Sequence, residues 1–452
     1  MSYQTKLEKL ELKKAAFQKS SPARDRITAL FDGGTFVELD AFAACGEDGV
    51  GVITGYGSIE GDVVYAFSQD ITTLGGAVSR AHAEKIAKVY DLAVKNGAPL
   101  VAIYDSNGAK LSEGPEILAS YGKILAAASN LSGVVPQIAV VAGSCVGISA
   151  MMACSADVVV MAEEASLYFA DAEGDSSAAA AKEAGVADIV CGDAAAAVAA
   201  ARELVSMLPL NNLSVAPVCE GTPSGVVVDP AMDPIDLIKA ICDADTVVEL
   251  KAGYADAACT ALASIGGSTV GVVYACGRAG RKSNGKIADF VRFCDSFNLP
   301  VVTFVNVEGF CTCGGIKTES AKISAKLARA YADATTAKIT VYVGSAIGAA
   351  AIAFGNADLR IAWPGAVISA LEPLTAVEFF WHDKLKGAED AAKLREQLAE
   401  EYAETEASPY EAAGASMVEE IIDPANTRSA LISALEMLAS KRVSRLPKKH
   451  TS

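Results

Sequence analysis

The sequence predicts an α/β protein that consists of two similar domains in tandem. Three observations lead to this prediction. The chain has 452 residues, too long for one ordinary hydrophobic core and about right for two or three domains. Short apolar, β-branched runs alternate with helix-period segments, as is typical of βαβ units with largely parallel sheets. Finally, residues near 85–157 match residues near 286–358 at a constant offset without a gap.

This internal repeat keeps glycines, a proline and an aspartate in one register. Its offset of 201 residues carries Lys85-Ile86-Ala87 to Lys286-Ile287-Ala288, Pro99 to Pro300, Gly108 to Gly309, Gly143-Ser144 to Gly344-Ser345, Gly147 to Gly348 and Ala156-Asp157 to Ala357-Asp358. Chance rarely preserves such a set in order. We therefore predict two domains related by internal duplication, at residues 1–215 and 216–452.

Each copy predicts the same order of elements: a helix, a buried strand, a polar loop with glycine, a further helix, a second buried strand, a glycine turn and an Ala-rich helix. In the first copy we place the first helix at 81–95, the strands at 99–104 and 137–142, the loop at 105–108 and the turn at 143–147; in the second copy the corresponding ranges are 286–297, 300–305, 338–343, 306–309 and 344–348. The apolar stretches 133–156 and 339–357 are long enough for membrane spans. Gly and Ser interrupt both stretches, so we interpret each stretch as a buried strand, a turn and a buried helix and not as a membrane span.

Composition argues against several classes of function. The net charge is −17 and only residues 441–450 are basic, so we expect no nucleic-acid partner. The eleven Cys are scattered through apolar runs, which indicates reduced, buried thiols in a cytoplasmic protein. Cys311 and Cys313 are the one close pair, and without a CxxC or His cluster we expect no metal site. The N-terminal segment is a charged helix and not a signal peptide.

The glycine loops are the features that could carry chemistry. A Gly turn between a strand and a helix exposes N–H groups without internal partners, and the helix dipole favours negative charge beside them. Two such loops facing each other make a two-donor pocket for an oxyanion. The predicted donors are Gly108, Ala109, Gly147 and Ile148 in the first domain and Gly309, Phe310, Gly348 and Ala349 in the second. A single loop of this kind is structural at least as often as functional, but four in duplicated register favour function.

Conventional catalytic side chains are scarce. The chain has three His (His82, His382 and His450), and a lone His is more often a structural hydrogen-bonding group than a base. The loops match neither GxGxxG nor a P-loop, and GxSxG does not occur. The sequence therefore favours a reaction that depends on backbone donors.

Several segments along nearly the whole chain are individually weak signals but specific in combination. They include Ala23-Arg24-Asp25-Arg26-Ile27, Asp105-Ser106-Asn107-Gly108-Ala109-Lys110, Gly143-Ser144-Cys145-Val146-Gly147, the run 290–300, Glu308-Gly309-Phe310 and Gly314-Gly315-Ile316. In this order they resemble the carboxyltransferase family of biotin-dependent acyl-CoA carboxylases and decarboxylases. The resemblance implies a crotonase-like (ClpP-like) fold of ββα repeats in each domain.

The resemblance also implies a function. The N-terminal domain would bind a CoA thioester and the C-terminal domain a biotin, with the two meeting across a dimer interface. One oxyanion hole would hold the ureido oxygen of biotin and the other the thioester enolate, with Gly314, Gly315 and Ala350 at the biotin. Implied partners are a biotin carboxyl carrier protein, a biotin carboxylase or membrane decarboxylase subunit, and further copies of the chain. The location would be the cytoplasm or the periphery of a membrane complex. The acyl group stays open among propionyl/methylmalonyl, acetyl/malonyl and glutaconyl types.

The sequence departs from the family pattern at three glycine positions, in a shorter loop at 311–315 and in Leu371-Glu372-Pro373, which replaces a usual small turn with Gly. Asn107, Ile148 and Ala349 stand where the family usually has a second Gly, and we expect Asn107 and Ile148 to narrow the CoA side. Two alternative interpretations stay open. One is a crotonase-type hydratase or biotin-independent decarboxylase, although those usually have one half of this length. The other is a catalytically altered subunit that binds acyl-CoA or serves as a scaffold.

Overall fold

A computed structural model describes residues 3–45, 48–170, 174–311, 317–386, 388 and 390–443. The chain divides into two compact units. Unit 1 is Met1–Pro217 with Lys251–Tyr254, and unit 2 is Val218–Leu250 with Ala255–Ser452. The segment Lys251–Tyr254 belongs to unit 1 because Lys251 N donates to Asp188 O at 2.8 Å.

Unit 1 is built on an eight-stranded sheet in the order β1-β4-β5-β6-β7-β8-β10, with β9 paired to β7 outside this path. The β4–β5 hairpin and β1 pair antiparallel, and the strands from β5 to β10 pair parallel. The strands are β1 (Val37–Leu39), β4 (Val52–Ile59), β5 (Asp62–Gln69), β6 (Leu100–Ser106), β7 (Gln137–Val146), β8 (Val158–Ala162), β9 (Ser166–Tyr168) and β10 (Ile189–Cys191), beside a separate ribbon of β2 (Ala44–Cys45) and β3 (Asp48–Gly49).

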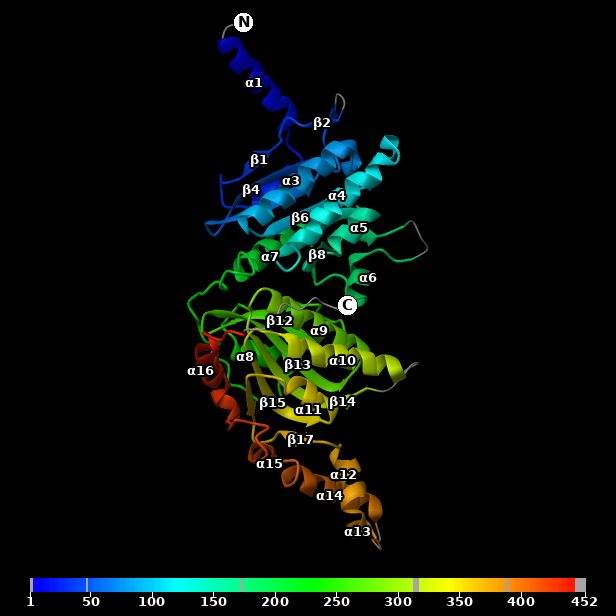
Figure 1. Cartoon of the computed structure of the whole chain (residues 1–452), viewed down its shortest axis with the longest axis vertical. Helices are drawn as coiled ribbons and strands as arrows, with labels where there is room; N and C mark the ends of the chain where they lie inside the picture. Colours follow the sequence, from blue (N-terminus) through cyan, green and yellow to red (C-terminus); the bar gives the residue numbers. More distant parts are fainter. Residues whose placement is uncertain are drawn as a thin grey trace. The chain divides into compact units, whose positions relative to one another are not determined.

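The described helices of unit 1 cover both faces of this sheet, except for the first, which buries none of its residues. They are α1 (Tyr3–Phe17), α2 (Pro22–Leu30), α3 (Arg80–Asn96), α4 (Glu116–Leu131), α5 (Ile148–Ala153), α6 (Ala178–Glu183) and α7 (Ala194–Met207), with 3-10 turns η1 (Leu74–Gly76) and η2 (Leu111–Glu113). Helices α3 and α4 lie side by side (Figure 1) and share one core with Leu100, Ala102 and Tyr104 of β6. Because side chains alternate along a strand, the buried Val101 and Ile103 face the other side, where α2 and α7 pack together.

Unit 2 repeats this plan. Its eight-stranded sheet has the order β11-β12-β13-β14-β15-β16-β18, with β17 paired to β15. The strands are β11 (Val248–Leu250), β12 (Ala258–Ile265), β13 (Ser268–Ala279), β14 (Val301–Phe310), β15 (Lys338–Ile347), β16 (Leu359–Ala362), β17 (Val367–Ser369) and β18 (Glu420–Ile421). The helices are α8 (Pro234–Ile241), α9 (Arg281–Ser296), α10 (Lys317–Asp333), α11 (Ala349–Phe354), α12 (Pro373–Phe380), α13 (His382–Leu385), α14 (Ala391–Glu404), α15 (Pro409–Gly414) and α16 (Thr427–Leu438), with the 3-10 turn η3 (Pro424–Asn426). Helices α12 to α14 form a small separate cluster around Val377 and Leu398.

The two units share details that only a duplication explains. In unit 1, Asp32 Oδ2 accepts from Gly61 N in the β4–β5 turn (3.2 Å), and the carboxylate is paired with Arg202 of α7. In unit 2, Asp243 Oδ2 accepts from Gly267 N in the β12–β13 turn (2.8 Å), and the carboxylate is paired with Arg428 of α16. The predicted α/β fold of two duplicated domains is therefore confirmed.

The two long apolar stretches fold as predicted. Each one forms a strand, a glycine turn and a short helix, namely β7 with α5 and β15 with α11. Within the described residues, no helix combines the length and the apolar character that crossing a bilayer requires. The cysteines with described side chains are free, but not all are buried as predicted: Cys154 and Cys219 are exposed.

Candidate active site

The central strands of each sheet reach further than the sequence predicts. β6 ends at Ser106 and β14 at Phe310, so half of the predicted loop 105–108 and all of the predicted loop 306–309 are strand. β7 and β15 likewise continue through most of the predicted turns 143–147 and 344–348. The polar residues of these segments stay extended because they pair with neighbouring strands. That pairing is not visible in the local sequence.

A bulge interrupts the pairing of β6 with β7. Tyr104 pairs with Val141, but Ser106 pairs with Cys145, so residues 142–144 of β7 stand opposite a single residue of β6. We call residues 142–144 the unit-1 bulge. The same shift occurs between β14 and β15 and defines the unit-2 bulge, residues 343–345. The bulges turn the strand ends aside, so β7 pairs with β8 in its first half and with β9 in its last three residues.

One polar side chain fills each bulge. A Cβ atom on Gly143 would lie 2.2 Å from Asp105 Oδ1, and a Cβ atom on Gly344 would lie 2.2 Å from Asn306 Oδ1. Asp105 is almost fully buried, and its Oδ2 is paired with Arg26 Nη1 of α2 at 2.7 Å. Both bulge glycines are therefore required for space.

The turns after β7 and β15 require glycine for a different reason. Gly147 has φ 66° and ψ −129°, and Gly348 has φ 59° and ψ −126°. This conformation is essentially restricted to Gly. Gly147 N donates to Tyr168 O at 2.9 Å and Gly348 N donates to Ser369 O at 2.8 Å. These two predicted donors thus already have strand partners.

The next amides are the available ones. Ile148 N and Ala349 N begin α5 and α11, and the described part of the chain provides no acceptor for either. Both helices have only six residues, so the predicted helix-dipole contribution is small and the individual N–H groups matter more.

The first loop of unit 1 presents a similar amide. Gly108 N donates to Ser106 Oγ at 3.1 Å, so it is engaged. Val78 N donates to Gly108 O and Lys110 N donates to Val78 O, both at 2.9 Å. These two hydrogen bonds pair Val78 with Ala109 in a parallel β-bridge. Ala109 N therefore points away from Val78, and no described atom accepts a hydrogen bond from it. A Cβ atom on Gly108 would lie 3.9 Å from Val146 O, so this loop adjoins the turn that carries Ile148.

The two side chains that we expected to narrow this site have contacts with neighbouring structure, and Asn107 is exposed. Asn107 N donates to Gly75 O at 3.0 Å, and Asn107 Nδ2 would lie 3.2 Å from a Cβ atom on Gly75. The Asn107 side chain therefore covers η1. The Ile148 side chain is half-buried against the core shared by α3 and α4.

The equivalent loop of unit 2 lies beside an ion-pair cluster. Cys311 N donates to the carbonyl of the last β13 residue at 2.8 Å, so Phe310 N points away from β13. Arg278 of β13 pairs in register with Gly309, and its guanidinium lies 2.9 Å from Glu372 and 3.8 Å from Glu308. Arg278 lies on β13, on one side of β14, and Glu372 follows β17, which is paired to β15 on the other side. The ion pair between them therefore spans the end of β14. The predicted biotin residues Gly314 and Gly315 lie outside the described residues, and Ala350 is completely buried in α11.

His82 lies near the unit-1 loops but is not a candidate base. It is fully buried, and burial, with a smaller effect of Lys85, lowers its pKa to about 3. Its Nε2 lies 3.4 Å from Gln69 Nε2, and Gln69 Oε1 accepts from Asp105 N at 3.2 Å. Its Nδ1 has no partner of normal geometry among the described residues, although the Ala77 backbone partly offsets the lowered pKa. The ring is thus neutral and structural at neutral pH.

The other titratable groups do not change this picture. His382 is exposed on α13, and His450 lies outside the described residues. Among the described side chains, no group of three His, Cys, Asp or Glu is arranged to hold a metal ion.

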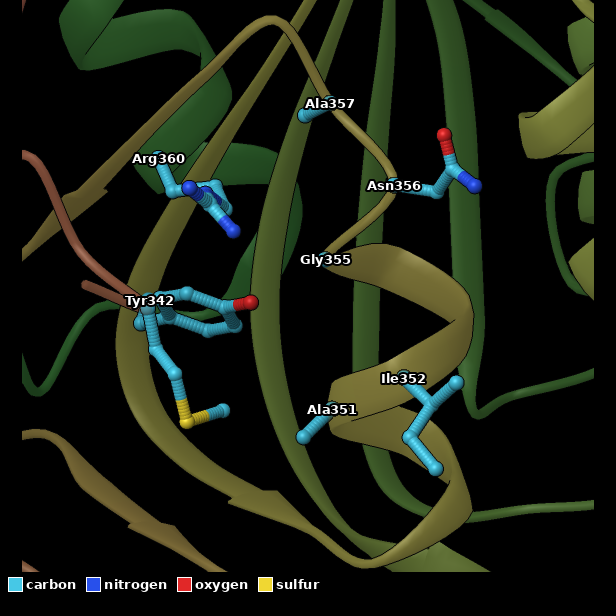
Figure 2. A pocket seen from close by; sticks show the side chains of 8 residues that line it. Tyr342, Ala351, Ile352, Gly355, Asn356, Ala357 and Arg360 are labelled. Atoms are coloured by element: carbon cyan, nitrogen blue, oxygen red, sulfur yellow. The ribbon is translucent and has the colours of Figure 1, made fainter. Parts of the chain in front are cut away.

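A pocket of about 340 Å³ in unit 2 lies at the C-terminal half of α11 (Figure 2). It is lined by Tyr342, Ala351, Ile352, Gly355, Asn356, Ala357, Arg360 and Met417. Arg360 is paired with Glu419, and burial raises the pKa of Tyr342 to about 12. The amide of Ala349 is at the opposite end of α11, so this pocket is not the candidate site.

Residues 19–452 match the family described as "Carboxyl transferase domain", and the chain belongs to this family. The predicted family and enzyme class, a carboxyltransferase of the biotin-dependent acyl-CoA carboxylases and decarboxylases, are confirmed.

Individual relatives agree with this assignment. The chain is 34% identical to the methylmalonyl-CoA decarboxylase subunit alpha of Propionigenium modestum, over 95% of this chain and 92% of that one. It is 35% identical to the methylmalonyl-CoA carboxyltransferase 12S subunit of Propionibacterium freudenreichii subsp. shermanii, over 96% and 91%. The solved structure of a transcarboxylase 12S hexamer with methylmalonyl-CoA bound matches with a TM-score of 0.92 at 32% identity, over 100% of this chain and 98% of that one.

Proposed function

We propose that the chain moves a carboxyl group between the α-carbon of an acyl-CoA and the biotin of a partner protein, with the thioester at unit 1 and the biotin at unit 2. Unit 1 offers Ala109 N and Ile148 N on adjoining loops, and unit 2 offers Phe310 N and Ala349 N. The duplication of these amide pairs at the ends of the central strands is the observation that carries the proposal.

Paired amides suit the chemistry at an acyl-CoA. Loss of the α-carboxyl group, or of the α-proton in the reverse direction, leaves negative charge on the thioester oxygen. One well-placed N–H donor can stabilise such charge by roughly 3 kcal/mol in a dry site. Because His82 is neutral and fully buried, proton transfer at the α-carbon does not involve its ring.

The unit-2 residues fit biotin as the second substrate. Biotin carries the carboxyl group between the active sites of such enzymes. Its ureido carbonyl oxygen accepts N–H hydrogen bonds, and Phe310 N and Ala349 N are donors of this type. The Ala350 side chain is buried, so a contact from this residue would use its backbone.

The relatives narrow the acyl group and the setting. Relatives that act on methylmalonyl-CoA or propionyl-CoA favour this pair of substrates over malonyl-CoA and glutaconyl-CoA. The hexamer of the transcarboxylase 12S favours an oligomer, and the decarboxylase relative favours a complex with a biotin carrier protein and a carboxylase or membrane subunit. We place the chain in the cytoplasm or at the periphery of such a complex.

The direct test is a substrate screen with free biotin. The purified chain is incubated with methylmalonyl-CoA, malonyl-CoA or glutaconyl-CoA, and loss of the substrate carboxylate is followed by chromatography. Biotin-dependent turnover supports the proposal. Turnover without biotin would indicate a biotin-independent decarboxylase, and CoA binding without turnover would indicate the altered scaffold subunit.

Proline variants test the donors themselves. Ile148→Pro removes the N–H at the first helical position, where proline is tolerated, and should lower kcat on the order of 10²- to 10³-fold. Ala194→Pro makes the same change at the start of α7, away from the loops, and should keep full activity. Ile148→Val, which keeps the N–H, should also stay active. Equal kcat in Ile148→Pro and Ala194→Pro would remove Ile148 from the site.

A further inference from the structure

We propose that Arg26 is a positioning residue of the unit-1 site: by neutralising Asp105 inside the unit-1 bulge, it fixes the loops that carry Ala109 N and Ile148 N. The role of these amides rests on the function proposed above. The ion pair itself joins α2 to the end of β6 across 79 residues of sequence.

Asp105 is in contact with both strands that lead to the loops of Ala109 and Ile148. Its backbone lies in β6, three residues before Gly108, and its carboxylate occupies the space above Gly143 in β7. The bulge around that carboxylate redirects β7 toward β9, and the redirected end leads through Gly147 to Ile148. A shift of the Asp105 carboxylate must therefore move the two loops relative to each other.

A carboxylate in this place needs a counter-ion. The Asp105 side chain is 7% exposed, and the facing Arg26 side chain is 16% exposed. Removing one partner of such a buried pair leaves an uncompensated charge that would draw in water or rotate out of the bulge. Replacing both partners by neutral groups often costs little.

Unit 2 contains the neutral counterpart. Asn306 occupies the unit-2 bulge in the same geometry, and its Oδ1 accepts from Ser345 N at 2.9 Å. A neutral amide thus holds the same bulge without an arginine. The duplication therefore suggests a double variant. Unit 1 should accept an asparagine in place of Asp105 when the charge of Arg26 is also removed.

The experiment compares Arg26→Met with the double variant Arg26→Met/Asp105→Asn. In the biotin-dependent assay, Arg26→Met should lower kcat on the order of 10²-fold, as expected for loops displaced by about 1 Å, with KM for the acyl-CoA changed less than about threefold. The double variant should recover kcat to within about threefold of the unchanged chain. Arg202→Met removes the arginine paired with Asp32, which binds the β4–β5 turn at the other end of the strands from the bulge, and should keep kcat.

Hydrogen exchange gives a readout that does not depend on turnover. Peptides covering residues 105–112 and 144–152 should exchange faster in Arg26→Met and return to normal in the double variant. Peptides 306–311 and 344–353 of unit 2 serve as an internal control and should stay unchanged. If the chain lacks biotin-dependent turnover, the proposed function fails while this measurement still decides the role of Arg26.

Three outcomes would overturn the inference: kcat unaffected in Arg26→Met, no recovery in the double variant, or exchange that rises equally in both units. Should Arg26→Met fail to fold, Arg26→Lys and the double variant replace it. Arg26→Lys keeps the charge and should retain most of kcat, and a folded double variant with low kcat would contradict the neutral-replacement argument.

Discussion

Gly143→Ala is the sharpest single test of the bulge geometry. The new methyl group would lie 2.2 Å from Asp105 Oδ1, whereas an ordinary contact needs about 3.4 Å, so the carboxylate must move by roughly 1 Å. It cannot move freely, because it is buried and paired with Arg26 at 2.7 Å. Overpacking of this kind costs about 1–3 kcal/mol. Displacement of reacting groups by about 1 Å lowers kcat on the order of 10²-fold.

The assay for Gly143→Ala combines thermal unfolding with biotin-dependent decarboxylation of methylmalonyl-CoA. Gly122→Ala is the matched control, because Gly122 lies exposed in α4 with no atom within 4 Å of the new Cβ. It should be stabilised by up to about 1 kcal/mol and keep its activity. A Gly143→Ala chain as stable and as active as Gly122→Ala would refute the reasoning about the bulge.

Three further predictions concern other parts of the site. Gly147→Ala forces an L residue into a conformation that only Gly adopts well, so kcat should fall on the order of 10²-fold while circular dichroism stays native; unchanged kcat would contradict the role of this turn. Burial lowers the pKa of His82 to about 3, so the stability that its neutral ring contributes is complete above about pH 6.5 and is lost as pH falls toward 3. His82→Gln should therefore flatten the fall in unfolding free energy between pH 6.5 and 4 in urea titrations, and an unchanged slope would show that the ring does not titrate in this way. Glu372→Gln loosens the ion pair with Arg278 and should change KM for free biotin roughly two- to fivefold, with little effect on KM for the acyl-CoA. Glu378→Gln, in the helix α12 that Glu372 precedes, removes a charge paired with Arg395 and should change neither KM; equal effects of the two variants would argue against a role for Glu372.

The fold was largely predictable because the repeat carries its own register. The prediction placed the first strands at Pro99 and Pro300, and the structure begins β6 and β14 one residue later, at Leu100 and Val301. Their ends were not predictable. Polar residues such as Asn306 read locally as a loop, and the pairing of Asn306 with Cys276 of β13 keeps this residue extended.

The sequence predicted the loops and eight candidate donors, but not which of those amides are available. Which amide is available depends on strand partners distant in sequence, as when Tyr168 O takes the N–H of Gly147 and leaves that of Ile148. The contribution of Arg26 was also missed. The segment that contains it entered only as part of the family resemblance, and nothing in its local pattern points to Asp105.

The divided pairing of β7 has a mechanical consequence. On the side away from β6, the last three residues of β7 pair with the three residues of β9, whereas its first half pairs with β8 of the broad sheet. A strand that short can detach at a small fraction of the cost of melting the unit. Enzyme activity should therefore be lost at a lower denaturant concentration than the one that unfolds the whole chain. In unit 2, the equally short β17 pairs with the end of β15 in the same way and should detach at a similarly low cost.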